Sequence, residues 1–164
     1  MVKVGVIGVG YLGQHHARIY SELKGVELVG VADIDEKRVS EIAKKYSCRA
    51  YTNYYELLKE VEAVSIVVPT VHHYAVAIDA INENIDILVE KPITSTIDEA
   101  EILIREADKK NLILQVGHLE RFNSALMELS KKVKNPIFIE SQRISPFLGR
   151  GIDVDVVVDL MVHD

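Results

Sequence analysis

The stretch that decides the fold is VKVGVIGVGYLG, which runs from Val2 to Gly13. Its first half is apolar and rich in valine, which predicts a buried strand over Val2–Ile7. Three glycines follow in the pattern GxGxxG, and the apolar residues after them recur every three or four positions, which predicts a helix. A strand, a glycine turn and a helix in this order are typical of a site that binds the pyrophosphate of a dinucleotide.

The three glycines have separate predicted tasks. Gly8 makes the tight turn, Gly10 allows the pyrophosphate to approach the backbone, and Gly13 lets the helix pack closely on the strand. Tyr11 and Leu12 lie between them at the start of the helix, where free backbone N–H groups face the phosphates. GxGxxG alone is a weak signal, and the alternative is a glycine turn with a purely structural role.

An acidic residue follows the second predicted strand, Val26–Ala32, at the distance that this kind of site requires. The carboxylate of Asp33 can accept hydrogen bonds from the adenosine ribose and would repel a 2′-phosphate, so NAD is favoured over NADP. Asp33 or Asp35 could instead cap the next helix, and Asp35 is better placed to do so. Lys37 and Arg38 leave NADP as the minority alternative.

Strand-length apolar blocks alternate with segments of helical period along the first 120 residues. The strands carry few polar alternations, which is typical of a sheet covered by helices on both faces. We therefore predict an α/β fold, a Rossmann-type doubly wound parallel sheet with right-handed crossovers. The other predicted strands are Ala63–Val68, Ile85–Val89 and Leu112–Val116, and the other predicted helices are Lys37–Tyr46, Tyr54–Lys59, Tyr74–Asn82 and Ile97–Lys109.

The pattern changes after residue 118. A helix is predicted around Phe122–Leu129, then a strand over Ile137–Ile144 whose apolar and polar residues alternate, and a last helix that opens near Asp153. Such alternation indicates a one-sided sheet, and a strand of this kind needs partner strands that the chain does not supply. We expect residues 1–120 to form a dinucleotide-binding domain and residues 121–164 to be the truncated start of an α/β second domain.

Composition excludes several classes of protein. The 164 residues carry 19 basic and 25 acidic side chains, a formal charge of -6 without a basic cluster, so nucleic acid is not an expected partner. Cys48 is the single cysteine, which favours a reducing compartment. No apolar run reaches the roughly 20 residues of a membrane span, and the first residues lack the build of a signal peptide, so we expect a cytoplasmic protein without a membrane partner.

Several histidines follow predicted turns, and none suggests a metal centre. His15 and His16 come soon after the glycine turn, where we expect one ring to face the cofactor groove and the other to pack against the sheet. A metal ion would need more ligands than these two, so no metal is expected.

Glu90, Lys91 and Pro92 follow the predicted strand Ile85–Val89, at the edge where open parallel sheets bind their ligands. A lysine at that edge can meet a bound substrate. The alternative is an exposed lysine before a loop proline, and spacing alone leaves both interpretations open.

Asp159 and His163 lie four residues apart in the last predicted helix. Residues at this spacing share a helix face, so both side chains can reach one substrate hydroxyl, and a carboxylate beside a histidine suits a general base. The alternative is a surface ion pair near the end of a helix.

Together these features resemble one family of nicotinamide-dependent dehydrogenases, the glucose-fructose oxidoreductase, inositol dehydrogenase and MocA (Gfo/Idh/MocA) family. Residues 116–123 and 155–164 are similar to the branch that oxidises nucleotide-linked amino sugars, such as UDP-N-acetylglucosamine 3-dehydrogenases. The features that carry the resemblance are the N-terminal GxGxxG, Asp33, Pro69 with His73, Glu90-Lys91-Pro92, and Asp159 with His163.

The resemblance implies an enzyme that transfers hydride between a secondary hydroxyl of a sugar, or nucleotide sugar, and the nicotinamide of NAD(P). Lys91 would be the catalytic lysine that polarises the reacting oxygen, His163 would accept the hydroxyl proton, and Asp159 would orient His163 or Lys91. The implied cofactor-binding residues are Gly8, Gly10, Tyr11, Leu12, Gly13, Asp33, Pro69, His73, Glu90 and Lys91.

The resemblance also implies a second domain with an open sheet that often mediates assembly, so a homo-oligomer is expected. Family members are much longer than this chain, and we expect the isolated chain to bind cofactor but to turn over poorly. The alternative function is a non-catalytic dinucleotide-binding or regulatory module.

Overall fold

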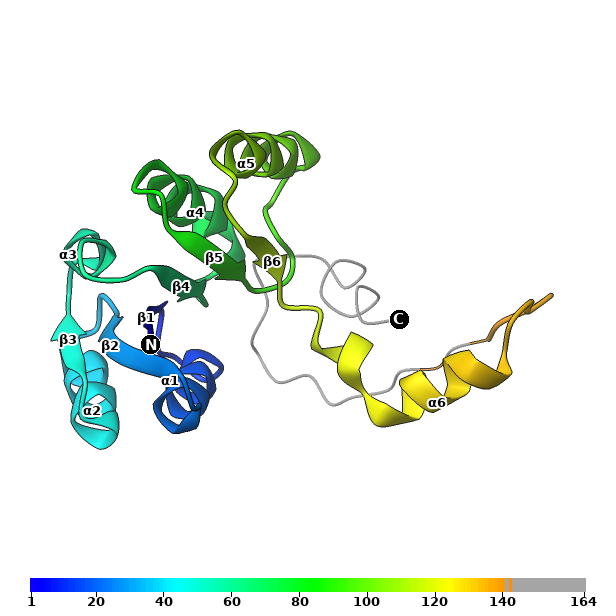
Figure 1. Ribbon diagram of the computed structural model, residues 1–164, viewed down its shortest axis with the longest axis horizontal. Helices are drawn as coiled ribbons and strands as arrows, with labels where there is room; N and C mark the ends of the chain where they lie inside the picture. Colours follow the sequence, from blue (N-terminus) through cyan, green and yellow to red (C-terminus); the bar gives the residue numbers. More distant parts are fainter. Residues whose placement is uncertain (141, 143–164) are drawn as a thin grey trace.

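The computed structural model describes residues 1–140 and 142, and its centre is a six-stranded parallel sheet with the strand order β3-β2-β1-β4-β5-β6 (Figure 1). The strands are β1 (Val2–Ile7), β2 (Val26–Ala32), β3 (Arg49–Tyr51), β4 (Ala63–Ile66), β5 (Asp86–Val89) and β6 (Leu114–Val116). The helices are α1 (Gly13–Glu22), α2 (Glu36–Tyr46), α3 (Tyr54–Leu58), α4 (His73–Asn82), α5 (Ile97–Lys110) and α6 (Ser124–Lys132), with short 3-10 turns η1 (Thr70–His72) and η2 (Leu119–Phe122).

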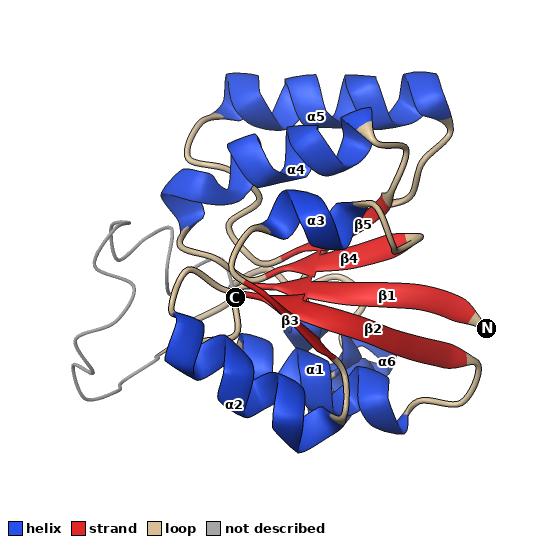
Figure 2. Ribbon diagram, turned by 90° about the vertical axis from the view of Figure 1, so that its left-hand side faces the viewer, coloured by secondary structure: helices blue, strands red, loops and turns tan. Residues whose placement is uncertain are grey.

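Helices cover both faces of the sheet, as the apolar strands predicted. Figure 2 shows α3, α4 and α5 on one side of the strands and α1 and α2 on the other. The first layer packs residues such as Leu57, Ile81 and Leu103, each 0% exposed, against the sheet, and the second layer packs Ala17 and Val39. The predicted Rossmann-type α/β fold is confirmed.

The order of the strands reverses at β1. Ile7 at the end of β1 pairs with Ala32 of β2 on one side and with Ile66 of β4 on the other. After β1 the chain adds β2 and β3 on one side of that strand. It then crosses back and adds β4, β5 and β6 on the other side. In open α/β sheets, ligands bind where the strand order reverses in this way.

The ends of α2 follow local rules that the sequence already shows. The side chain of Asp35 accepts a hydrogen bond from the backbone N–H of Arg38, so Asp35 is the N-cap as predicted. That backbone N–H is the main cause that lowers the pKa of the Asp35 carboxyl. Ser47 ends the helix with a left-handed backbone, φ 54°.

The strands differ from expectation at two places. β3 was not predicted, because three residues with an exposed Arg49 give too short a pattern to recognise. An alternating strand was expected over Ile137–Ile144. Residues 137–140 form no strand, and residues 141, 143 and 144 lie outside the described part of the chain. Ile137 and Ile139 are fully or largely exposed, and no strand of the described sheet lies beside them to pair with their backbone.

The region after β6 also differs in detail from expectation. The helix predicted around Phe122 is divided: Phe122 ends η2, and α6 starts at Ser124 with the side chain of Asn123 as its cap. The helix expected near Asp153 lies outside the described residues. Within residues 1–140, no helix combines the length and hydrophobicity that crossing a membrane requires.

Candidate functional site

The turn after β1 depends on glycine at two positions. Gly8 has φ +85°, and a Cβ there would lie 2.5 Å from the carbonyl oxygen of Val67. At Gly13 a Cβ would lie 1.8 Å from the carbonyl oxygen of Gly8. In both cases the atom that the added Cβ would meet belongs to the backbone, which cannot move aside as a flexible side chain can. Gly8 and Gly13 therefore let α1 begin directly above the end of β1.

Gly10 is different because the chain itself does not require a glycine there. A Cβ at Gly10 would meet no atom within 4 Å. The residue borders a surface groove of about 400 Å³, which is lined by Val9, Gly10, Tyr11, Gln14, Arg38, Glu41 and Ile42. The space beside its backbone is open to a ligand, which is the condition that close approach of a pyrophosphate requires.

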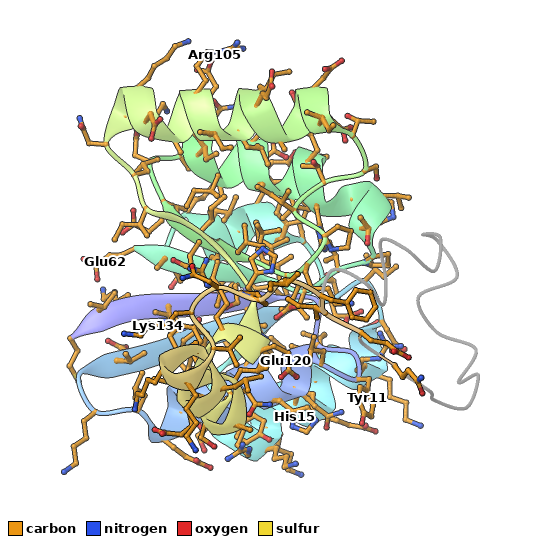
Figure 3. The ribbon with its side chains drawn as sticks, turned by 90° about the vertical axis from the view of Figure 1, so that its right-hand side faces the viewer. Tyr11, His15, Glu62, Arg105, Glu120 and Lys134 are labelled. Atoms are coloured by element: carbon orange, nitrogen blue, oxygen red, sulfur yellow. The ribbon has the colours of Figure 1, made fainter. Side chains whose placement is uncertain are left out.

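The N-terminus of α1 has no capping side chain. α1 has no side chain that caps its first N–H groups and no acidic residue in its first turn, whereas side chains cap α2, α3, α5 and α6. The exposed ring of Tyr11 packs edge-on against His15, 5.9 Å between ring centres (Figure 3). Uncapped N–H groups and the helix dipole together favour a phosphate at this end.

Asp33 ties the glycine turn to the end of β2. Its Oδ2 accepts a hydrogen bond from the backbone N–H of Val9 at 2.9 Å, and its Oδ1 accepts one from Asp35 N–H at 3.0 Å. The guanidinium of Arg38 lies 3.3 Å from both carboxylate oxygens. The Asp33 side chain is 6% exposed and that of Arg38 is 46% exposed, so the arginine forms the outer margin of the groove.

The residues after β4 and β5 form the other end of the candidate site. Pro69 is exposed and precedes η1, and His73 is 1% exposed at the start of α4. The Nδ1 of His73 lies 2.8 Å from the carbonyl oxygen of Pro92, and its Nε2 lies 2.9 Å from that of Val68. A neutral imidazole has one N–H and satisfies one of these carbonyls, whereas an imidazolium satisfies both.

Glu90 is buried beneath the loop that carries Lys91. It is 5% exposed, its Oε1 lies 3.2 Å from Nε2 of His16, and its Oε2 accepts the backbone N–H of Lys91 at 3.3 Å. A Cβ at Gly117 would lie 2.7–2.9 Å from the carboxylate, so the end of β6 closes over it. Lys91 itself is partly buried.

The structure brings most of the predicted residues to one edge of the sheet. The glycine turn, Asp33, Pro69, His73, Glu90 and Lys91 all follow the carboxyl ends of β1, β2, β4 or β5. Asp159 and His163 lie outside the described residues. As expected, one of the two neighbouring histidines packs: the side chain of His16 is 10% exposed, whereas His15 is exposed.

Sequence reasoning did not find the partners of His16. Its Nδ1 lies 3.2 Å from the hydroxyl of Ser65, and that hydroxyl lies 2.7 Å from the hydroxyl of Tyr20. The available signal was Ser65 itself, a polar residue in an otherwise apolar strand. Among the residues with a described placement, no three His, Cys, Asp or Glu side chains gather as a metal site would require.

Comparison with known proteins defines the class. The family described as "Oxidoreductase family, NAD-binding Rossmann fold" (Gfo/Idh/MocA) matches residues 2–118. The chain belongs to this family, and the resemblance seen in its motifs is confirmed.

Relatives that match most of this chain carry the names of dehydrogenases. The chain is 42% identical to UDP-N-acetylglucosamine 3-dehydrogenase of Acidithiobacillus ferrooxidans over 99% of this chain and 52% of the relative. The solved structure of that enzyme matches with a TM-score of 0.91, at 41% identity, over 99% of this chain and 53% of that one. The scyllo-inositol 2-dehydrogenase (NAD(+)) of Bacillus subtilis is 30% identical over 99% of this chain and 52% of its own length.

A third comparison concerns the cofactor. The structure of GenD2 from gentamicin A biosynthesis in complex with NAD matches with a TM-score of 0.70, at 28% identity, over 71% of this chain and 34% of that one. The chain spans about half the length of the curated relatives it matches.

Proposed function

We propose that the protein is an NAD-dependent dehydrogenase of sugars or nucleotide sugars, and that this chain supplies its cofactor-binding domain. The observation that carries the proposal is the open space beside Gly10, at the uncapped start of α1 and next to the reversal of strand order. A glycine that its own chain does not need, placed at this point, fits a pyrophosphate. The match to UDP-N-acetylglucosamine 3-dehydrogenase supports a nucleotide sugar as substrate.

The residues present fit the dinucleotide along the whole edge of the sheet. Gly8, Gly10, Tyr11, Leu12 and Gly13 would surround the pyrophosphate, and the carboxylate of Asp33 would meet the adenosine ribose. Pro69, His73, Glu90 and Lys91 would form the nicotinamide end. The imidazole ring of His73 and the carboxylate of Glu90 are buried. We therefore propose that both side chains act mainly by shaping the loop that carries Lys91.

NAD is proposed over NADP because the Asp33 carboxylate, directly after β2, would repel a 2′-phosphate. Arg38 is the feature that favours the alternative, since its partly exposed guanidinium could pair with such a phosphate. Titration calorimetry of the 164-residue chain with NADH and with NADPH decides between them. The proposal requires tighter binding of NADH, and Asp33→Asn should narrow the difference by removing the negative charge.

The chemistry proposed for this chain is proton and charge handling around the reacting hydroxyl. A bound nicotinamide supplies the hydride acceptor. Lys91, directly after β5, would hold the substrate oxygen and stabilise its developing negative charge. His163 would accept the hydroxyl proton and Asp159 would orient His163 or Lys91; these two roles rest on the family resemblance. Positioning of donor and acceptor can supply roughly 7–11 kcal/mol of the barrier reduction.

The second candidate function is a non-catalytic dinucleotide-binding module. It is favoured by the fact that the described groove involves only the Rossmann domain. Two measurements, NADH binding and oxidation of UDP-N-acetylglucosamine, separate the two functions. Both are made on the unaltered native protein and on its Lys91→Ala variant. Retained binding with lost oxidation supports the dehydrogenase, whereas a native protein that binds NADH and oxidises no sugar supports the module.

Assembly and location are further parts of the proposal. We propose a homo-oligomer, formed through the second domain as in the family that the chain belongs to, and light scattering of the native protein tests it. A cytoplasmic location is proposed on the basis of the composition and the single Cys48. Fractionation of cells tests this second point.

A further inference from the structure

Glu90 is a carboxylate in a place where a carboxylate is costly. Its side chain is 7% exposed, and burying an ionised group without partners disfavours the folded state. The two carboxylate oxygens face different parts of the fold. Oε1 lies 3.2 Å from His16 Nε2 on α1, a polar contact without the alignment of a hydrogen bond, and Oε2 accepts the backbone N–H of Lys91 at 3.3 Å. The carboxylate therefore bridges α1 and the backbone of the lysine.

The ring of His16 is fixed from its other side. Ser65 is 0% exposed, and its hydroxyl lies 3.2 Å from Nδ1 of His16 and 2.7 Å from the hydroxyl of Tyr20. Hydroxyl groups either donate or accept, so Ser65 and Tyr20 can satisfy Nδ1 in either state. The carboxylate of Glu90 can only accept. The tautomer that suits both neighbours carries its hydrogen on Nε2, the nitrogen that faces Glu90.

The carboxylate is also close to the backbone that follows β6. Gly117, at the end of β6, donates its backbone N–H to the carbonyl of Val89 at 2.9 Å, and a Cβ at Gly117 would lie within 3 Å of the Glu90 carboxylate. Glu90 is thus enclosed between α1 on one face of the sheet and the end of β6. A carboxylate held on both sides can transmit the placement of α1 to the residue that follows it.

We propose that His16, acting through Glu90, is a positioning residue for Lys91. The pair links the helix that would receive the diphosphate with the loop that carries the lysine, so that the two ends of the site keep a fixed relation. The functional meaning rests on the role proposed above for Lys91. The physical linkage is a property of the described residues and can be measured without cofactor or substrate.

The test follows the Lys91 amine directly in the 164-residue chain. Its lysines are reductively methylated with carbon-13 formaldehyde, and the dimethylamine signal of Lys91 is assigned with Lys91→Arg. Glu90→Gln leaves one acceptor oxygen in place of two, and His16→Leu removes the ring N–H. Each variant should shift the Lys91 signal toward the signals of exposed lysines such as Lys59. His16→Gln is the matched control: its amide keeps an N–H toward Glu90 and should leave the signal in place.

Two results would overturn the proposal. One is an unchanged Lys91 signal in Glu90→Gln or His16→Leu when near-ultraviolet circular dichroism shows a native fold. The other, measured on the unaltered chain and so independent of whether any variant folds, is a proton–nitrogen correlation spectrum in which Nε2 of His16 carries no hydrogen. NADH binding is titrated separately. Its absence would count against the proposed function and would leave the result for the Lys91 signal valid.

Discussion

Replacement of Gly10 by alanine separates binding from folding in this chain. A Cβ at Gly10 meets no atom of the protein within 4 Å, and its backbone lies outside the left-handed region that disfavours alanine. Alanine also restricts the unfolded chain, which stabilises a protein by about 0.4–1 kcal/mol where the native backbone tolerates it. We expect the free energy of unfolding of Gly10→Ala to be unchanged or slightly higher.

The effect on cofactor binding should be opposite. The methyl group would occupy the space through which a pyrophosphate reaches the backbone at the start of α1. A hydrogen bond to a charged group contributes about 1.5–3 kcal/mol. Loss of one such bond weakens binding of NADH about 10- to 150-fold, since each 1.4 kcal/mol corresponds to a factor of ten.

Gly13→Ala is the matched control for the same methyl group. There the added Cβ would lie 1.8 Å from the carbonyl oxygen of Gly8, so α1 must move away from the turn. We expect a loss of stability of about 1–3 kcal/mol or more, as for other overpacked sites. This variant should lose stability and NADH binding together, whereas Gly10→Ala should lose binding alone.

Denaturant unfolding and calorimetric titration with NADH measure the two quantities on the same samples. A Gly10→Ala chain that binds NADH as tightly as the unaltered chain would show that no phosphate approaches this backbone, and the proposed site would be wrong. A Gly10→Ala chain that is strongly destabilised would show that the space beside Gly10 is needed by the protein itself.

Three further predictions concern the core and the titrating groups. Leu57 is 0% exposed beneath Gly5, so Leu57→Ala should cost about 2–5 kcal/mol in denaturant unfolding, and a loss below 1 kcal/mol would contradict this packing. Burial raises the pKa of Cys48 to about 11, so iodoacetamide should alkylate the folded chain slowly at pH 8 and faster as the pH approaches 11; equal rates for folded and urea-unfolded chain would refute this. Burial, with smaller effects from Tyr55 and Asp79, raises the pKa of Tyr54 above its ordinary value. The unfolded chain therefore releases this proton first, at about pH 10, so the free energy of unfolding should fall as the pH rises beyond that point. The fall should be smaller in the Tyr54→Phe variant, which lacks the phenol.

Local chemistry made much of this protein predictable. The capping of α2 by Asp35 and the positive φ of Gly8 are local features, and both follow from the properties of residues close in the chain. The parallel sheet was predictable because strands covered on both faces are apolar throughout. The edge on which Glu90 and Lys91 lie then followed, since the carboxyl ends of parallel strands share one edge.

Contacts between distant residues were decided only in the tertiary structure. His16 meets Glu90 across 74 positions of sequence, and neither residue carries a local sign of the other. The alternation predicted a strand over Ile137–Ile144, and its described part, residues 137–140, forms none, because a strand depends on a neighbour to pair with its backbone and not on its own pattern alone. Periodicity and turn chemistry act within a few residues, so the sequence by itself determined the elements and their order. Partners for buried polar groups and for strand edges come from elsewhere in the chain, and only the folded arrangement supplies them.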